Sequence, residues 1–211
     1  MKITKFGHCC LLIEEGSARI LTDPGTYSAG QNDLVNLDVI LITHEHADHI
    51  DLSSLKVLIS KNPQAVIMTN MGCGTLLKKE NIEHKLLEHG QSVEVKGVLI
   101  EGFGEKHAIT QITLAPVNNT GYFIANRFFY PGDALYNPGK RVEALALPVA
   151  GPWLKLSEAI DYAKEIHPKV CFPVHEGILK SPGSVHAIPP NILGPLGIEF
   201  KILEEGKLME F

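Results

Sequence analysis

The chain has 211 residues, of which 45% are apolar and 20% charged, and its formal net charge is −5 at neutral pH. That length accommodates one domain with a substantial core, so we predict a single domain over residues 1–211. An acidic chain without a basic stripe cannot neutralise many phosphates, and no apolar run approaches the length of a membrane span. We therefore expect neither nucleic acid nor a membrane as the main partner.

The N-terminal segment and the cysteines indicate a cellular location. Residues 1–6 lack the apolar core and the small-residue cleavage site of a signal peptide. The cysteines show no C-x-x-C pairing and sit in apolar surroundings: Cys9, Cys10, Cys73 and Cys171. Such residues are typical of reduced core thiols, so we expect a cytoplasmic protein. A homo-oligomer is compatible with the sequence.

The first third of the chain alternates between strand and helix patterns. Residues 2–13 predict two short strands interrupted by Gly7 and His8, and residues 19–22 predict a strand that ends at Asp23. Residues 38–42 form an apolar, β-branched run typical of a buried strand. The next elements are a helix at about 51–60, a strand at 65–69 and a short helix at 71–80. This alternation indicates the α/β class.

Four potential metal ligands follow the strand at 38–42 within six residues: His44, His46, Asp48 and His49. Side chains at i and i+2 of extended backbone project to the same side, so His44 and His46 can reach one point. A turn into a helix near Asp48 would bring Asp48 and His49 in from another angle. Imidazole and carboxylate groups suit zinc, manganese or iron. A His-rich polar loop is the alternative, but chance gives this pattern on the order of once in a thousand such sequences.

The second half continues with strands and one clear helix. Strands are expected at 93–103 (an antiparallel pair turning at Gly97), 122–130 (a hairpin turning at Asn126), 144–149, 169–174, 198–203 and 207–211. An amphipathic helix is expected at about 157–167, with Ser157 as its cap. The stretch 178–191 is the least regular and predicts a solvated loop.

The His-x-His-x-Asp-His pattern after an apolar strand closely resembles the signature of the metallo-β-lactamase-fold hydrolases. The resemblance extends over nearly the whole chain. It is greatest to small, single-domain metal-dependent hydrolases related to L-ascorbate-6-phosphate lactonase. It implies an α/β fold, namely an αβ/βα four-layer sandwich in which two mixed sheets pack face to face.

The resemblance also implies ligands far from the motif. His107 stands where similar proteins place a third histidine ligand, Asp133 where they place a carboxylate shared by two metals, and His175 where they place the last ligand. From the residues alone, His107 is as compatible with a structural histidine, and Asp133 with a turn residue that ends a strand. A shared anion would offset the repulsion between two cations.

Two earlier residues are implied to support this site. Similar proteins bury an aspartate beneath the metal histidines at the position of Asp23, and such partners fix the tautomer of a ligating ring. The alternative for Asp23 is a turn residue before Pro24. His8 belongs to a Gly-His pair that similar proteins carry near the active-site mouth, which makes it a candidate substrate contact. The alternative is a partly buried structural histidine.

Three later residues are further candidates for substrate contact. Trp153, the only tryptophan, lies on a loop at the ligand end of the sheet, where it would wall the pocket or cap the core. Lys180 and His186 lie in the 178–191 stretch, which similar proteins place beside the active site. Both have the chemistry to meet a polar or phosphorylated group, although an ordinary solvated loop would contain the same residues.

The predicted chemistry is metal-dependent hydrolysis. One divalent ion would take His44, His46 and His107, the other Asp48, His49 and His175, and both would share Asp133. Zinc fits first, with manganese or iron as alternatives. A water that bridges two metals acquires a pKa of about 7. The resulting hydroxide would attack a small ester-, lactone- or phosphoester-type substrate, and the resemblance implies that Asp48 receives the proton of the water. A lactonase-like activity is the leading expectation. The alternatives are a phosphodiesterase or nuclease-like hydrolase and a metal-binding module without activity.

Overall fold

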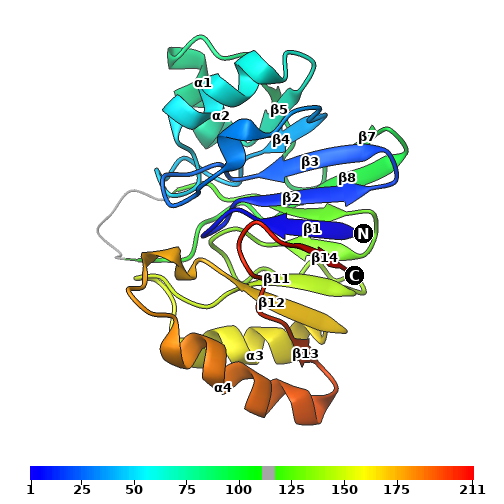
Figure 1. Ribbon diagram of the computed structural model, residues 1–211, viewed down its shortest axis with the longest axis vertical. Helices are drawn as coiled ribbons and strands as arrows, with labels where there is room; N and C mark the ends of the chain where they lie inside the picture. Colours follow the sequence, from blue (N-terminus) through cyan, green and yellow to red (C-terminus); the bar gives the residue numbers. More distant parts are fainter. Residues whose placement is uncertain (111–116) are drawn as a thin grey trace.

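The computed structural model describes residues 1–110 and 117–211, and two seven-stranded sheets dominate it (Figure 1). The first sheet has the order β14 (Leu208–Glu210), β1 (Lys2–Lys5), β2 (Leu11–Glu15), β3 (Ala18–Thr22), β4 (Val39–Leu41), β5 (Val66–Thr69) and β6 (Lys85–Leu86). The second has the order β13 (Glu199–Phe200), β12 (Val170–Val174), β11 (Ala144–Pro148), β10 (Phe128–Tyr130), β9 (Gly121–Ile124), β8 (Val98–Phe103) and β7 (Ser92–Val95).

Both sheets are mixed, with an antiparallel part and a parallel part. In the first sheet β14, β1, β2 and β3 pair antiparallel, whereas β3, β4, β5 and β6 pair parallel. The second sheet repeats this arrangement, antiparallel from β7 to β10 and parallel from β10 to β13. Tight turns join some antiparallel neighbours, such as β9 and β10 through Ala125–Asn126 with positive φ at both residues, whereas parallel neighbours need longer crossovers.

Helices cover the outer faces of the sheets and produce four layers. Figure 1 shows α1 (Leu52–Lys61) and α2 (Met71–Lys79) at one end of the long axis and α3 (Leu156–Ile166) and α4 (Gly183–Leu193) at the other. Leu55, Leu58 and Leu77 pack on the first sheet, and Ile160 and Leu193 pack on the second. Short 3₁₀ turns complete the chain: η1 (Gln31–Asp33), η2 (Glu176–Ile178) and η3 (Gly194–Leu196). The predicted αβ/βα sandwich is therefore confirmed.

The main core lies between the two sheets. Inward residues of the first sheet, such as Ile13 and Leu41, belong to one apolar cluster with Tyr122, Phe128 and Phe172 of the second sheet. Burying a large apolar side chain of this kind contributes about 1.5–3 kcal/mol to folding. The four cysteines are buried free thiols, as expected: Cys9, Cys10, Cys73 and Cys171. None of the helices in residues 1–110 and 117–211 combines the length and hydrophobicity of a membrane-spanning segment.

Two predictions about helices are wrong. The stretch 178–191 is not a solvated loop, because α4 begins at Gly183 and continues through Pro189 and Pro190. Three residues spaced by four are buried against α3 and the second sheet: Val185, Pro189 and Leu193. The free energy gained by this packing outweighs the cost of the backbone hydrogen bonds that the two prolines cannot donate.

The other helix error concerns the residue that begins α3. The helix starts at Leu156, with Lys155 rather than Ser157 as its N-cap. The Glu158 carboxylate accepts a hydrogen bond from the Lys155 N–H at 2.8 Å and satisfies one end of the helix without a serine cap. The motif segment shows a similar shift: Asp48 and His49 occupy a turn, and α1 begins after the N-cap Asp51, whose carboxylate accepts from Ser54 N at 3.0 Å.

Candidate metal centre

The seven predicted ligands follow the C-terminal ends of four strands. The segment after β4 of the first sheet carries His44, His46, Asp48 and His49. The segments after β8, β10 and β12 of the second sheet carry His107, Asp133 and His175 respectively. The structure brings all seven together where the two sheets meet, so each sheet contributes to one cluster.

A first group contains three histidines and the shared aspartate. One ligand atom each from His44, His46, His107 and Asp133 lies within 4.8 Å of the others. His44 Nε2 is 3.0 Å from His46 Nδ1, and His107 Nε2 is 3.2 Å from Asp133 Oδ2. His46 and His107 are partly exposed, whereas His44 and Asp133 are buried, so the group opens toward solvent on one side.

A second group lies on the other side of Asp133. Asp133 Oδ1 is 3.0 Å from His49 Nε2, and Asp133 Oδ2 is 2.9 Å from His175 Nε2. Asp48 Oδ2 is 3.4 Å from His175 Nε2 and 3.9 Å from His49 Nε2. The Asp133 carboxylate therefore contacts ring nitrogens of both groups.

Hydrogen bonds outside the cluster fix the orientation of three rings. His49 Nδ1 donates to Asp23 Oδ2 at 2.7 Å, and His107 Nδ1 donates to the Ala108 carbonyl at 2.5 Å. Thr43 Oγ1 donates to Asp23 Oδ2 at 2.7 Å and can therefore accept from His44 Nδ1, 3.0 Å away. With each Nδ1 carrying the hydrogen, the Nε2 lone pair of each ring points into the cluster, which is the state that binds a metal.

Asp23 is the centre of these supporting bonds. Asp23 is 0% exposed, and its backbone has a φ of +37°, a left-handed conformation that a non-glycine residue seldom adopts. Besides His49 and Thr43 Oγ1, its carboxylate accepts hydrogen bonds from the Thr43 backbone N–H at 2.8 Å and from the Tyr130 hydroxyl. The structure thus places Asp23 beneath the motif histidines rather than in an exposed turn.

Asp133 is held by its neighbours in a defined position. Asn119 Oδ1 accepts from the Asp133 N–H at 3.0 Å, and Trp153 Nε1 donates to Asp133 Oδ2 at 2.9 Å. Gly132 has a φ of +63°, and a Cβ there would lie 2.4 Å from Asn119 Oδ1 and 2.8 Å from Thr43 Cβ. Only glycine fits this approach, so the Gly-Asp pair is a requirement of the packing.

The donor atoms of the cluster are those that a metal would satisfy. Within the described residues, His49 Nε2, His107 Nε2, His175 Nε2 and Asp133 Oδ1 are buried without a well-aligned hydrogen-bond partner. Buried polar atoms of a folded protein are nearly always paired, and unpaired ones require an explanation such as an ion. Imidazole nitrogens with carboxylate oxygens match the ligands of zinc, manganese or iron. The residues present therefore fit the metal that such a site requires.

Burial and proximity shift the pKa values of the cluster. Burial alone would raise the pKa of Asp133, but the nearby rings of His49, His107 and His175 hold it well below its usual range. Burial opposes the charge on His49, yet Asp133, Cys9 and Asp23 raise its pKa well above the usual value. Burial likewise opposes charge on His175, whose pKa the Cys9, Asp133 and Asp48 side chains raise to about 10.

These shifts predict that metal uptake releases protons. The raised pKa values of His49 and His175 favour their protonated forms in the metal-free chain, so an ion would displace protons from these rings. The apparent metal affinity should therefore rise with pH until the His175 pKa of about 10 and fall as the pH is lowered. Calorimetric zinc titrations in buffers of different protonation enthalpy measure this release. Identical heats in all buffers would contradict the expected coupling.

The four candidates for substrate contact lie in different environments. The His8 side chain is 0% exposed and lies 3.3 Å from Asp48 Oδ2, beneath the cluster rather than at its mouth. Trp153 is half-buried, with its ring 5.8 Å from those of His107 and His175. Lys180 is exposed, and His186 on α4 lies 3.5 Å from Glu176. Of the four, the structure brings His8 and Trp153 into contact with predicted ligands.

Sequence reasoning missed several residues that contact the ligands. Thr43, Asn119 and Tyr130 hold Asp23, His44 or Asp133 in place, and only Thr43, which directly precedes the motif, could have been suspected from its position. Cys9 lies in a further cluster with His8, His49 and His175, in which one potential ligand atom of each residue is within 4.8 Å of the others. Burial would raise the pKa of its thiol, but these three histidines lower it to about 6.

Trp153 should report metal binding, because it is the only tryptophan and its indole donates directly to Asp133. An ion that draws electron density from Asp133 weakens this hydrogen bond, so zinc should change the indole emission. A fluorescence titration of the metal-free chain is expected to saturate at the zinc content found by elemental analysis. Unchanged emission at full zinc loading would contradict the geometry.

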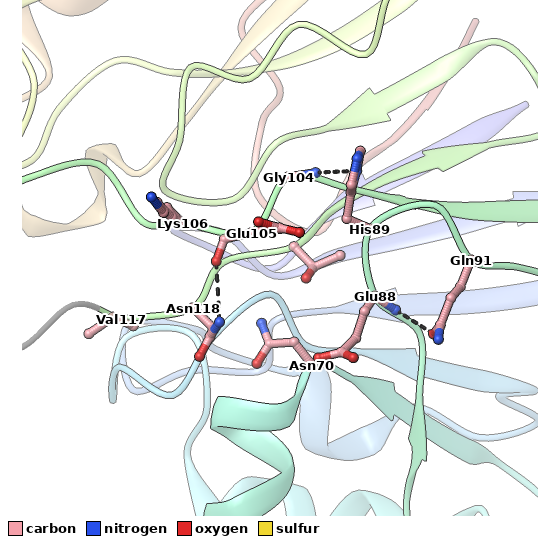
Figure 2. A pocket seen from close by; sticks show the side chains of 10 residues that line it. Asn70, Glu88, His89, Gln91, Gly104, Glu105, Lys106, Val117 and Asn118 are labelled. Atoms are coloured by element: carbon pink, nitrogen blue, oxygen red, sulfur yellow. Dashed lines mark hydrogen bonds between the residues drawn. The ribbon is translucent and has the colours of Figure 1, made fainter.

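A polar cavity of about 400 Å³ includes Lys106, the residue before His107, in its lining (Figure 2). It is lined by Asn70, Glu88, His89, Gln91, Gly104, Glu105, Lys106, Val117, Asn118 and Thr120. Backbone hydrogen bonds join residues 105–107 to residues 117–119. In this paired segment His107 belongs to the cluster, and Lys106 lines the cavity. The cavity offers amide, hydroxyl, carboxylate and ammonium groups, and none of the seven predicted ligands lines it.

Comparison with known proteins places these observations in context. The sequence profile of a family described as "Beta-lactamase superfamily domain" matches residues 2–175. The protein Rv0786c of Mycobacterium tuberculosis is 36% identical over 184 residues, which cover 85% of each chain. A UPF0173 metal-dependent hydrolase of Thermoplasma acidophilum is 26% identical over 191 residues, which cover 83% of each chain.

A solved structure shows the same fold. A metallo hydrolase of Ignicoccus hospitalis superposes with a TM-score of 0.77 at 20% identity, over 100% of this chain and 98% of the other. At this identity the likeness concerns the architecture alone. The superposition covers the whole length of the present chain.

Proposed function

We propose a binuclear hydrolytic mechanism from one premise, that the chain belongs to the metallo-β-lactamase superfamily, among its metal-dependent hydrolases. The observation that carries the proposal is the convergence of oriented imidazole nitrogens on the buried Asp133 carboxylate. These side chains come from both sheets, and the 3.4 Å approach of His175 to Asp48 joins segments more than 120 residues apart.

The two groups of ligands divide naturally between two divalent ions, with zinc favoured over manganese or iron. His44, His46 and His107 would hold one ion, and Asp48, His49 and His175 the other, with Asp133 common to both. When bound, such ions lower the pKa of water toward about 7 and polarise a carbonyl or phosphoryl oxygen. The charge of Asp133, buried at 2% exposure, offsets part of the repulsion that two cations would experience.

The side chains supply the remaining requirements of hydrolysis. Asp48 is 23% exposed, the most accessible carboxylate of the cluster, and is placed to orient the attacking water and receive its proton. Burial would raise the pKa of Asp48, but His175 and His8 hold it well below its usual range, so the carboxylate is ionised at working pH. Asp23 and Thr43, both buried beneath the ligands, keep the histidine rings fixed while charge develops in the transition state.

The substrate is proposed to be a small ester, lactone or phosphoester, with lactones favoured. The acidic net charge of −5 disfavours long polyanions such as nucleic acid, and hydrolysis of this kind requires no serine or cysteine nucleophile. The Thermoplasma acidophilum relative is named only as a metal-dependent hydrolase, so an assay decides among ester-type substrates.

A metal and substrate panel tests the proposal. The zinc-loaded and manganese-loaded chains are assayed on a lactone, a thioester and a phosphodiester, with ion content measured by elemental analysis. His46→Ala should lower turnover of the accepted class by more than about 100-fold. His84→Ala, a histidine outside both groups, serves as the matched control. Two bound ions without turnover on any class would instead identify a metal-binding module.

A further inference from the structure

The turn between β1 and β2 places a buried histidine beneath the second group of ligands. His8 has a φ of +28°, in the left-handed region that side chains seldom adopt. Gly7 precedes it with a φ of +91°, and a Cβ there would lie 2.6 Å from the Tyr27 carbonyl oxygen. Such a backbone persists only when surrounding contacts hold it, so the contacts of His8 identify what the turn is built around.

One set of contacts joins His8 to the turn that carries His175. The His8 carbonyl accepts from the His175 N–H at 3.2 Å, and His8 Nδ1 accepts from the Gly177 N–H at 3.1 Å. The His8 and His175 rings are 4.2 Å apart between centroids. His175 itself has a φ of +70°, so this ligand also sits on an unusual backbone that needs support.

The other contact joins His8 to Asp48. A backbone N–H can only donate, so Nδ1 of His8 must be the acceptor nitrogen and the ring hydrogen lies on Nε2. That Nε2 is 3.3 Å from Asp48 Oδ2, the same oxygen that faces His175 and His49. The His8 side chain is 0% exposed whereas Asp48 is 23% exposed, so His8 acts on Asp48 from below and does not meet substrate.

A buried ion pair anchors the same region. Lys5, at the end of β1, is 2% exposed, donates to the Pro173 carbonyl at 2.9 Å and pairs with Glu176, the residue after His175. The start of the chain is therefore tied to the His175 turn on both sides of that ligand.

We infer that His8 is a positioning residue of the metal centre: it orients Asp48 through Nε2 and fixes the His175 turn through Nδ1. The inference rests on the proposed function, because it concerns the second ion of that site. Partners of this kind orient ligands and typically change metal affinity by about 10–100-fold when removed. Both ring nitrogens of His8 are engaged by this site, Nε2 by Asp48 and Nδ1 by the turn that carries His175.

Two substitutions separate the bonds of the two ring nitrogens. His8→Asn keeps a polar atom near Nδ1 but loses the donor to Asp48, whereas His8→Gln can place an amide donor near the position of Nε2. We expect His8→Asn to weaken retention of the second ion by about 10–100-fold and His8→Gln to weaken it less. His167→Asn is the matched control, because His167 is exposed, ends α3 and is also left-handed with a φ of +49°.

Ion retention is measured by elemental analysis after equilibration with a competing chelator, and unfolding of the metal-free variants is followed by circular dichroism. Loss of about one ion per chain in His8→Asn only, with normal metal-free unfolding, supports the inference. Retention equal to the wild-type chain, or equal loss in His8→Asn and His8→Gln, overturns it. Absence of ions from the wild-type chain overturns the inference together with the proposed function.

A second variant covers the case in which His8→Asn does not fold. A Cβ at Gly177 would lie 3.0 Å from His8 Cβ and Nδ1, so Gly177→Ala displaces the ring without removing it. We expect the same selective loss of the second ion, and full retention would again overturn the inference. Because ion retention is read independently of turnover, a wild-type chain that binds two ions but hydrolyses nothing refutes only the proposed function.

Discussion

Replacing Asp133 with alanine is expected to abolish binding of both ions and to lower hydrolysis by more than about 100-fold, beyond the usual effect of an outer ligand partner. Its carboxylate lies 2.9–3.2 Å from ring nitrogens of His49, His107 and His175, so no other residue can replace it. The loss also removes negative charge that would offset the repulsion between two cations, even though it lowers the pKa of His49 and His175, which Asp133 raises.

The measurement is ion content by elemental analysis, followed by turnover on the accepted substrate class. Asp133→Asn preserves the shape of the side chain but not its charge, so it separates the electrostatic contribution from the steric one. Asp161→Ala, on the exposed face of α3, is the matched control. Full occupancy by two ions in Asp133→Ala would refute the shared-carboxylate arrangement.

Replacing Asp23 with alanine is expected to lower the free energy of unfolding of the metal-free chain by about 3–5 kcal/mol, the cost of breaking a buried charged network from one side. Asp23 accepts hydrogen bonds from His49, Tyr130 and two groups of Thr43, and it is 0% exposed. Its loss leaves these buried donors without an acceptor, each at a cost of about 1–3 kcal/mol that partial relaxation reduces.

Urea unfolding of the metal-free variants measures this effect without interference from bound ions. Asp51→Ala provides the comparison, because Asp51 caps α1 near the surface and a lost N-cap costs about 1 kcal/mol. Asp23→Asn should be intermediate, since an amide oxygen can accept some of the same bonds. A destabilisation of Asp23→Ala no larger than that of Asp51→Ala would show that Asp23 is not the centre of the network.

The ligand segments were predictable because they depend on local rules. His44 and His46 follow a strand at a spacing of two, and His107, Asp133 and His175 each follow an apolar run, so the pattern places them at strand ends. The sandwich followed from the alternation of strands and helices together with the resemblance to a family. The strand ends require only the periodicity of the backbone, whereas the ligand roles of His107, Asp133 and His175 came from the resemblance.

Apart from Asp23, which the resemblance implied, the supporting contacts were not predictable, because they join distant segments. Tyr130 reaches Asp23 over 107 positions, and His8 reaches Gly177 over 169 positions. The helix α4 was missed for a related reason: Pro189 and Pro190 disfavour a helix locally, and only burial of Val185 and Leu193 against other elements outweighs them. The local propensity of a segment does not depend on which distant residues it will contact.

The cluster sits on the seam between two sheets, and this has a consequence for how the molecule is assembled. A fragment containing only the first sheet's motif would possess His44, His46, Asp48 and His49, and the complementary fragment would possess the rest. Neither piece alone could hold an ion as the intact chain would. Ion binding would therefore add to the apolar core in holding the two halves together, so a chelator would lower the stability of this protein as well as its activity.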